Sequence, residues 1–272
     1  LLGSFFASLS ATLGGSTFVF TRFVINTIDP FTLSFIRYGF TGLILFLISI
    51  SIYLQKKFEY KDLLPMGFLG LAMVSVFPNF MALGLEHTTA ARAGLLYATM
   101  PLCTIIIAYF FKIEQITINK SIAVLLAIIG VSFCFSEKVD NNFSNTLRGD
   151  FLMMLGVFAA SCFTVFSGKF LKKYGNIPVM IYVLFVGSFF NFFLSLSLGN
   201  PIQSLIKINN FELLALIMLI LPGGVLMMYC WGKALQLITP TQAAISLGFN
   251  PLSAILLGSI ILNEEVTIRL VV

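Results

Sequence analysis

Residues 101–118 read PLCTIIIAYFFKIEQITI, and residues 251–268 read PLSAILLGSIILNEEVTI. Placed over each other without a gap, the two stretches share Pro, Leu, Ile, Glu, Thr and Ile at 101/251, 102/252, 105/255, 114/264, 117/267 and 118/268. Two unrelated Leu- and Ile-rich segments are not expected to align a proline, a glutamate and a threonine as well. The chain therefore contains an internal repeat.

The similarity continues outward from this pair of segments. Ala82-Leu83 corresponds to Ala234-Leu235, and Thr17, Arg22 and Phe23 correspond to Thr164, Lys169 and Phe170. A polar stretch, Glu137 to Arg148, lies between the two copies. We expect two domains, a first repeat over residues 1–136 and a second over residues 147–272.

Composition places both repeats in a lipid bilayer. Of the 272 residues, 58% are hydrophobic and only 10% are charged, whereas soluble domains carry roughly a quarter charged residues. The apolar runs are continuous over about twenty residues, which favours transmembrane helices over the shorter alternating strands of a membrane barrel. A water-soluble fold is excluded.

Turn-forming and charged clusters divide the chain into nine predicted spans. They lie near residues 2–25, 30–54, 63–85, 89–111, 120–136, 150–170, 177–199, 211–233 and 239–262. The repeat places a partner of the fifth span at about 270–286. We therefore expect an all-α membrane protein of about ten transmembrane helices, with the last one missing from this chain.

Five spans per repeat is an odd number, so the second copy must enter the membrane from the opposite face. The two repeats are therefore predicted to have inverted topology. Such pairs build many secondary transporters, with the substrate site near the membrane midplane between the halves.

Basic residues predict the orientation of the chain. With a cytoplasmic N-terminus, the inner side holds Lys56, Lys57, Lys61, Lys112, Lys120, Lys169, Lys172, Lys173 and Lys233. The outer side then holds the smaller set Arg22, Arg92, Lys138, Arg148, Lys207 and Arg269. The positive-inside rule favours this arrangement.

Several kinds of chemistry leave no mark on the sequence. Four cysteines fall inside apolar runs and there is one histidine, His87, so we expect no disulfide framework, metal site or cofactor. No phosphate-binding Gly-rich loop is present, which argues against ATP-driven transport by this chain alone. No acid lies plainly in mid-span, which favours facilitated diffusion or exchange over a buried proton relay. The +5 net charge reports orientation, and we expect no nucleic-acid partner.

The prolines at repeat-equivalent positions mark the candidate transport path. Pro101 and Pro251 each remove a helix hydrogen bond in mid-span, either as a paired hinge or as a packing kink. Tyr97 and Asn250 lie within a helical turn of them, and Asn79 aligns roughly with Trp231.

We predict that these four side chains line one cavity. The alternatives are hydrogen bonds between helices for the amides and an interfacial position for the tryptophan. Ser16, Phe20 and Gln242 are further candidates.

Three arginines are candidates for a positively charged outer mouth: Arg22, Arg37 and Arg92. Such a mouth favours solutes with carboxylate or phosphate groups. The alternative for Arg37 is snorkelling to the outer surface or a structural ion pair, and for the other two a solvated helix end.

Short motifs recur in order along almost the whole chain. They are GGSTF at 14–18, PFTLSFIR at 30–37, TTAARAGLLYATMP at 88–101, Glu114 with Thr117, Gly149-Asp150, PTQAAISLGFNP at 240–251 and Glu264. Together they resemble the drug/metabolite transporter superfamily, specifically its ten-helix proteins built from two EamA-type domains. The resemblance implies export or uptake of small organic solutes, without specifying one.

The expected function is secondary, non-ATP transport of a small organic metabolite, such as an amino acid or related solute, by alternating access. An intramembrane enzyme, a channel, or a membrane scaffold or receptor without solute flux are the alternatives, and we expect no catalysis. The expected setting is a bacterial inner membrane, with a small-molecule substrate and the lipid bilayer as partners and the chain acting as a monomer or homodimer.

Overall fold

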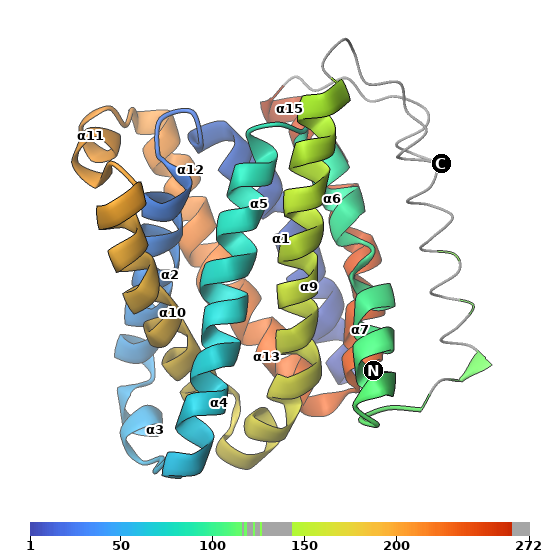
Figure 1. Ribbon diagram of the computed structural model, residues 1–272. Coiled ribbons are helices and arrows are strands. Elements are labelled where there is room, and N and C mark those ends of the chain that lie inside the picture. Colours follow the sequence, from blue (N-terminus) through green and yellow to red (C-terminus); the bar gives the residue numbers. More distant parts are fainter. Residues whose placement is uncertain (116, 119–121, 123–125, 127–142, 263–272) are drawn as a thin grey trace.

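The computed structural model describes residues 1–115, 117, 118, 122, 126 and 143–262. In these residues the ordered elements are helices, standing side by side in one bundle (Figure 1). Eight of them are long and apolar enough to cross a membrane. They match eight of the predicted spans, which confirms the all-α membrane fold, and the predicted span at 120–136 lies outside the described residues.

The first half contains four of these membrane-crossing segments. Its elements are α1 (Leu2–Val24), α2 (Pro30–Ile48), α3 (Ile50–Leu54), α4 (Tyr60–Gly70), η1 (Leu71–Val76), α5 (Phe77–Leu85), α6 (Ala90–Tyr97) and α7 (Met100–Phe110). The segment η1 is a π-helix that joins α4 to α5 within one membrane crossing. The pair α6 and α7 likewise forms one crossing with an interruption.

The second half repeats this pattern. Its elements are α9 (Phe143–Tyr174), α10 (Asn176–Leu198), α11 (Pro201–Ile206), α12 (Asn210–Ile220), η2 (Leu221–Leu226), α13 (Met227–Leu237), α14 (Pro240–Ile245), η3 (Ser246–Gly248) and α15 (Phe249–Ile261). Here η2 is again a π-helix, and the short 3₁₀-helix η3 interrupts the last crossing. Each interruption therefore has a counterpart at the same place in the other half.

The two halves run through the bundle in opposite directions. We call the end where α3 lies and α9 ends the lower end, and the end where α11 lies and α9 begins the upper end, as in Figure 1. Helix α1 runs from the lower to the upper end, whereas its counterpart α9 runs from the upper to the lower end (Figure 1). The inverted topology predicted from the repeat is thus present in the structure.

The helix starts follow local sequence signals. Asp29 accepts a hydrogen bond from the Thr32 backbone N–H at 2.9 Å, with Pro30 in the first turn of α2. Thr89 caps α6, and Thr239, its repeat equivalent, caps α14. These side chains satisfy N–H groups that a helix start leaves unpaired.

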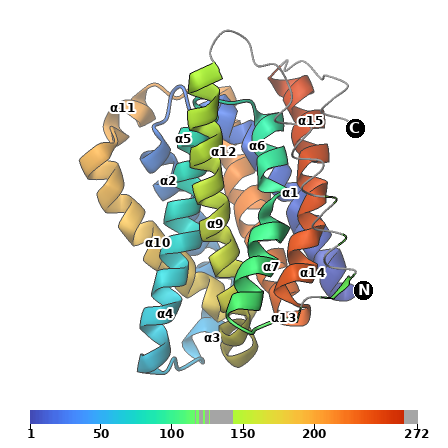
Figure 2. The ribbon, with the colours of Figure 1, turned by 45° about the vertical axis from the view of Figure 1, so that its right-hand side comes forward.

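The helices of one half pack against those of the other. Helix α2 lies along α10, α1 packs against α13 and α15, and α9 packs against α5 and α7. Figure 2 shows α14 and α15 standing beside α6 and α7. The core of the bundle is therefore the contact surface between the two repeats, and the interrupted crossings lie within it.

Candidate functional site

Two buried prolines mark the interrupted crossings. Pro101 lies in the first turn of α7, after the break at Ala98 and Thr99, and Pro251 lies in the first turn of α15, after η3. Each proline lacks the N–H that would bond the carbonyl four residues earlier, that of Tyr97 or Leu247. The two breaks are thus chemically alike and occupy equivalent positions in the repeat.

Asn250 is enclosed where α15 meets α1 and α6. Its side chain has no exposed surface, and neither its amide nitrogen nor its oxygen has a hydrogen-bond partner among the described residues. A Cβ at Gly14 would lie 3.2 Å from the Asn250 Oδ1, and one at Gly94 would lie 3.6 Å from the Pro251 Cα. The two glycines therefore let α1 and α6 approach the Asn250 amide closely. A buried amide without a hydrogen-bond partner costs free energy unless a ligand or a water molecule supplies that partner.

Tyr97 sits in a cluster of aromatic rings. Its ring stacks on that of Phe77, with centroids 5.2 Å apart, and meets the edge of Phe18 at 5.6 Å. The rings come from α6, α5 and α1, so three crossings of the first half contribute to one apolar surface. Aromatic walls of this kind are common in sites for small organic ligands.

Arg37 lies close to this cluster and is only 3% exposed. Its Nη2 donates to the Gly223 carbonyl of η2 at 3.0 Å, and its guanidinium lies over the Tyr38 ring at 4.8 Å. Tyr97 is near enough to interact electrostatically with both residues. Arg37 therefore does not snorkel to the outer surface, which corrects that reading of the sequence, because its side chain turns toward the neighbouring half.

A second polar cluster joins the π-helix η1 to α10. The Asn191 Nδ2 donates to the Val74 carbonyl at 2.8 Å, while its Oδ1 accepts from the Ser75 hydroxyl at 2.6 Å and the Asn79 amide at 3.0 Å. The Val74 carbonyl is free for this bond because Pro78, four residues later, has no N–H. Asn79 thus contributes to a contact between helices, and its Oδ1 has no partner among the described residues.

Arg37 and Asn191 lie at the same depth on neighbouring helices. The antiparallel pair α2 and α10 brings Thr32 Oγ1 within 2.8 Å of Ser195 Oγ and sets the rings of Phe35 and Phe192 5.3 Å apart. This register places Ile36 beside Asn191. The two polar clusters therefore occupy one central layer.

Trp231 lies outside this layer. It is buried on α13 at 3% exposure, and its Nε1 has no partner among the described residues. Ser10 donates to the Met227 carbonyl at 3.0 Å, one turn above Trp231 and one turn below Gly14 on their helices. Trp231 is thus roughly 12 Å nearer the lower end than Asn250, at 1.5 Å per residue.

The other path candidates make local contacts. Ser16 donates to the Leu13 carbonyl at 2.6 Å within α1. Phe20 packs against a separate apolar group that includes Leu216. Gln242 is exposed and completes the Thr239 cap of α14, so the structure does not bring these three side chains together.

The other two arginines do not share an open mouth with Arg37. The Arg92 guanidinium is held by Asp150, with Nη2 to Oδ2 at 2.7 Å and Nε to Oδ1 at 3.0 Å, and both side chains are almost fully buried. Arg22 is half-buried and donates to the Leu85 carbonyl at the upper end. In this structure the three arginines therefore form no shared open mouth, since Arg37 and Arg92 are buried against the other half.

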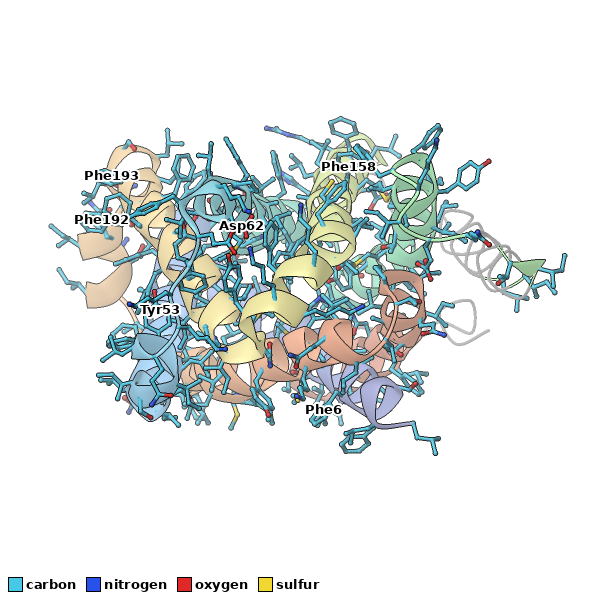
Figure 3. All side chains as sticks on the ribbon, turned by 90° about the horizontal axis from the view of Figure 1, so that it is seen from below. Phe6, Tyr53, Asp62, Phe158, Phe192 and Phe193 are labelled. Atoms are coloured by element: carbon cyan, nitrogen blue, oxygen red, sulfur yellow. The ribbon has the colours of Figure 1, made fainter. Side chains whose placement is uncertain are left out.

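Each end of the bundle has a polar contact between the halves. At the lower end, Asp62 of α4 accepts from Lys173 and Tyr174 of α9 at 2.6 and 2.7 Å. Figure 3, which views the bundle from below, shows Asp62 beside these helices, with Phe158, Phe192 and Phe193 at the rim. At the upper end, Glu212 of α12 accepts from Thr27, which follows α1. We call these the lower contact and the upper contact.

The two contacts are related by the repeat. Asp62 and Glu212 each lie in the first turn of their helix, at positions that the same alignment as Pro101 and Pro251 makes equivalent. Each acid reaches the end of the first helix of the opposite half. Both contacts are present in the structure, so both ends are held together at once.

Metal chemistry has no obvious ligands here. Within the part of the chain that the structure describes, no group of three His, Cys, Asp or Glu side chains is close enough to hold a metal ion. The polar groups of the central layer are amides, hydroxyls and one guanidinium. Such groups suit binding of a polar organic solute by hydrogen bonds.

Sequence reasoning missed Tyr38, Asn191, Phe18 and Phe77. Asn191 carries the same signal as Asn79 and Asn250, an amide inside an apolar run, and could have been found by that criterion. The three aromatic residues carry no such signal, because the chain has 30 Phe and 8 Tyr residues and most are not part of the site. Only packing distinguishes them.

Known proteins resemble this chain over most of its length. Residues 1–136 and 147–272 match the family model described as the EamA-like transporter family. An uncharacterized transporter of Archaeoglobus fulgidus is 25% identical over 267 residues, covering 97% of this chain and 91% of that protein. One from Clostridium kluyveri is 25% identical over 256 residues, covering 91% and 80%.

A solved protein structure has a similar fold. It superimposes with a TM-score of 0.70 at 15% identity, covering 97% of this chain and 90% of the other. At this identity the likeness concerns the fold alone.

Proposed function

Because this chain belongs to the EamA-like transporter family, we propose that it moves a small organic metabolite, such as an amino acid or related solute, across the membrane by alternating access. The proposed solute site is the central layer, with Tyr97 and Arg37 on one side and the unpartnered amide of Asn250, beside Gly14 of α1, as a further candidate. Asn79 supports this layer through Asn191. Transport would be secondary, driven by solute gradients.

The observation that carries this proposal is the pair of equivalent contacts at opposite ends. The lower contact ties α4 of the first half to α9 of the second, and the upper contact ties α12 of the second half to α1 of the first. Rocking of one half against the other would break one contact while keeping the other. Such a motion exposes a central site to each side in turn.

The proposed orientation places the lower end in the cytoplasm. The lower end, where α3 leads into α4 and where α9 ends (Figure 1), carries five lysines: Lys56 and Lys57 before α4, Lys61 in its first turn, and Lys172 and Lys173 in the last turn of α9. An excess of lysine at one end is the pattern that the positive-inside rule associates with the cytoplasmic side. We expect an impermeant maleimide to label Lys57→Cys only after the cells are permeabilised.

Counterflow in liposomes tests the transport proposal. Purified protein is reconstituted with unlabelled solute inside, and uptake of radiolabelled L-leucine, L-threonine, L-phenylalanine, uridine and phenylacetate is followed. We expect at least one of these solutes to show saturable uptake that unlabelled solute on the far side accelerates. Saturation and acceleration together mark a carrier. Its binding site must return to the outer side after each uptake step, and the return is faster when unlabelled solute occupies the site.

The matched control is a reversible lock on the same protein. Thr27→Cys with Glu212→Cys, in a background without native cysteines, should stop counterflow on oxidation and restore it on reduction. Flux that rises linearly with concentration would indicate a channel. No flux of any of the five solutes would contradict the proposal and favour a scaffold, a receptor or an intramembrane enzyme.

A further inference from the structure

The central layer contains a positive charge that no acid of the described residues neutralises. We propose that Arg37 binds the carboxylate of the transported solute, and that the chain carries small organic acids with an apolar body. This inference rests on the proposed transport function and names its substrate class.

The two buried arginines differ in their partners. Arg92 is paired with Asp150 in a two-pronged ion pair. Arg37 is as deeply buried, but its hydrogen bond goes to the Gly223 carbonyl, and its Nε has no partner among the described residues. No carboxylate of those residues lies within 4.0 Å of it.

An unpaired guanidinium at this depth carries a large desolvation penalty. A purely structural role would be served as well by a neutral donor, because the Gly223 carbonyl needs only one N–H. The charge is therefore best explained by a negative partner that is not part of the described chain. A bound solute anion is such a partner.

The free edge of Arg37 suits a carboxylate. A guanidinium presents its N–H groups in a planar fork that matches the two oxygens of a carboxylate. The Tyr38 hydroxyl, which is also fully buried, has no hydrogen-bond partner among the described residues. It belongs to the ring over which the Arg37 guanidinium lies at 4.8 Å, and it offers a second donor.

The surroundings set the rest of the solute. Tyr97 interacts electrostatically with Arg37 and Tyr38, and its ring contacts Phe18 and Phe77. These rings provide an apolar surface beside the charged group. A carboxylate joined to an aliphatic or aromatic body satisfies both parts, whereas a polyanion or a sugar would leave the rings unmatched.

The test compares acids with their own amides. Thermal unfolding of the purified protein in detergent is measured with phenylacetate, 4-methylpentanoate, L-leucine and L-phenylalanine, each beside the corresponding amide. We expect at least one acid to raise the unfolding temperature, because a ligand that binds only the folded state stabilises it. Its amide should bind about 10- to 100-fold more weakly, the factor contributed by a hydrogen bond to a charged group.

Variants of Arg37 assign the preference to this side chain. Arg37→Gln keeps a donor for Gly223 and should abolish the difference between acid and amide, while Arg37→Lys keeps the charge and should reduce the difference by about tenfold, because it loses the planar fork. Without ligand, Arg37→Gln should unfold at the same temperature as the natural protein or higher, since it removes an unpaired buried charge. A structural arginine would give a lower temperature.

Arg92→Gln is the matched control. It should lower the unfolding temperature of the empty protein and leave the preference for acids intact. The inference is wrong if no acid stabilises the protein, if amides bind as well as acids, or if Arg37→Gln and Arg37→Lys both keep the full preference. If one of these results is obtained and uridine or an amide still shows counterflow, the transport proposal stands and only the proposed binding of a carboxylate by Arg37 is excluded.

Discussion

The two π-helical segments show how the halves agree and how they differ. In both, a backbone carbonyl in the middle of a crossing is bonded by a polar side chain of the opposite half. Val74 of η1 accepts from Asn191 of α10, and Gly223 of η2 accepts from Arg37 of α2. The two arrangements lie at one depth. In each, the carbonyl belongs to one half and the side-chain donor to the other.

The chemistry of the two sides is different. Asn191 is neutral and uses both of its polar atoms, with Ser75 and Asn79 completing a hydrogen-bonded cluster. Arg37 is charged and leaves donor capacity unused. The repeat therefore sets the positions of the polar groups. Single substitutions within it decide which side holds the helices together and which side is available to a ligand.

The largest expected effect comes from making the halves alike at the start of their interrupted crossings. Arg92 occupies in α6 the position that Gln242 occupies in α14. Arg92→Gln removes one partner of a buried ion pair and leaves Asp150 unpaired, which costs about 3–5 kcal/mol. Unfolding in detergent should show this loss, whereas Gln242→Ala, at the exposed equivalent, should cost about 1 kcal/mol through its weakened cap.

The second prediction separates the two π-helical segments. Asn191→Leu removes the hydrogen-bond partner that the Val74 carbonyl, the Ser75 hydroxyl and the Asn79 amide share. It should lower the free energy of unfolding by about 2–3 kcal/mol. Arg37→Gln, on the other side, should cost nothing. Equal losses in the two variants would show that both clusters are structural.

The third prediction concerns the close approach of α1 to α15. A Cβ at Gly15 would lie 2.3 Å from the Asn250 carbonyl oxygen and 2.0 Å from the Ser253 Oγ. Gly15→Ala should therefore destabilise the protein by about 1–3 kcal/mol, as overpacking does. Cys162→Ala, at the repeat-equivalent position of α9, serves as the control and should unfold within about 1 kcal/mol of the natural protein.

The smallest effect concerns acidity at the two ends. Burial tends to raise the pKa of Asp29, but hydrogen bonds from Thr32, Asn200 and Ser204 together hold it below its usual range. The hydrogen bond from Lys173, with that from Lys61, lowers the pKa of Glu59 at the lower end.

A lowered carboxyl pKa gives stability above the ordinary pKa, about 4, and this stability is lost as the pH falls. For Asp29, which is about half exposed, we expect a loss below about 1 kcal/mol between pH 6 and pH 3. Asp29→Asn should remove that part of the pH dependence and keep the helix cap. An unchanged pH profile in this variant would contradict the assignment.

The fold was largely predictable from the sequence. The apolar runs of membrane length are membrane crossings in the structure. The helix breaks lie next to Pro101 and Pro251, as a local sequence signal predicts. The inverted arrangement follows from an odd number of spans. The π-helices were not predicted, because a proline such as Pro78 shows where a carbonyl is freed but not how the helix adjusts.

The site was only partly predictable. Tyr97 and Asn250 lie in the central layer, but a helix period alone does not show which neighbour a side chain faces. The long side chain of Arg37 can reach either the membrane surface or the core from the same position on α2. The sequence alone favoured the surface. Ser16 instead donates to the Leu13 carbonyl inside α1, as serine hydroxyls in helices often do. Gln242 completes the cap at the start of its own helix.

The most direct test of alternating access measures from which side the central layer is reached. In a background without native cysteines, Asn250→Cys is labelled with an impermeant maleimide in right-side-out and inside-out vesicles. One variant breaks the upper contact with Thr27→Val and Glu212→Gln, and the other breaks the lower contact with Asp62→Asn and Tyr174→Phe. Breaking the upper contact should speed labelling from the outer side and slow it from the inner side, and breaking the lower contact should do the reverse. Labelling that becomes faster from both sides in either variant would contradict alternating access.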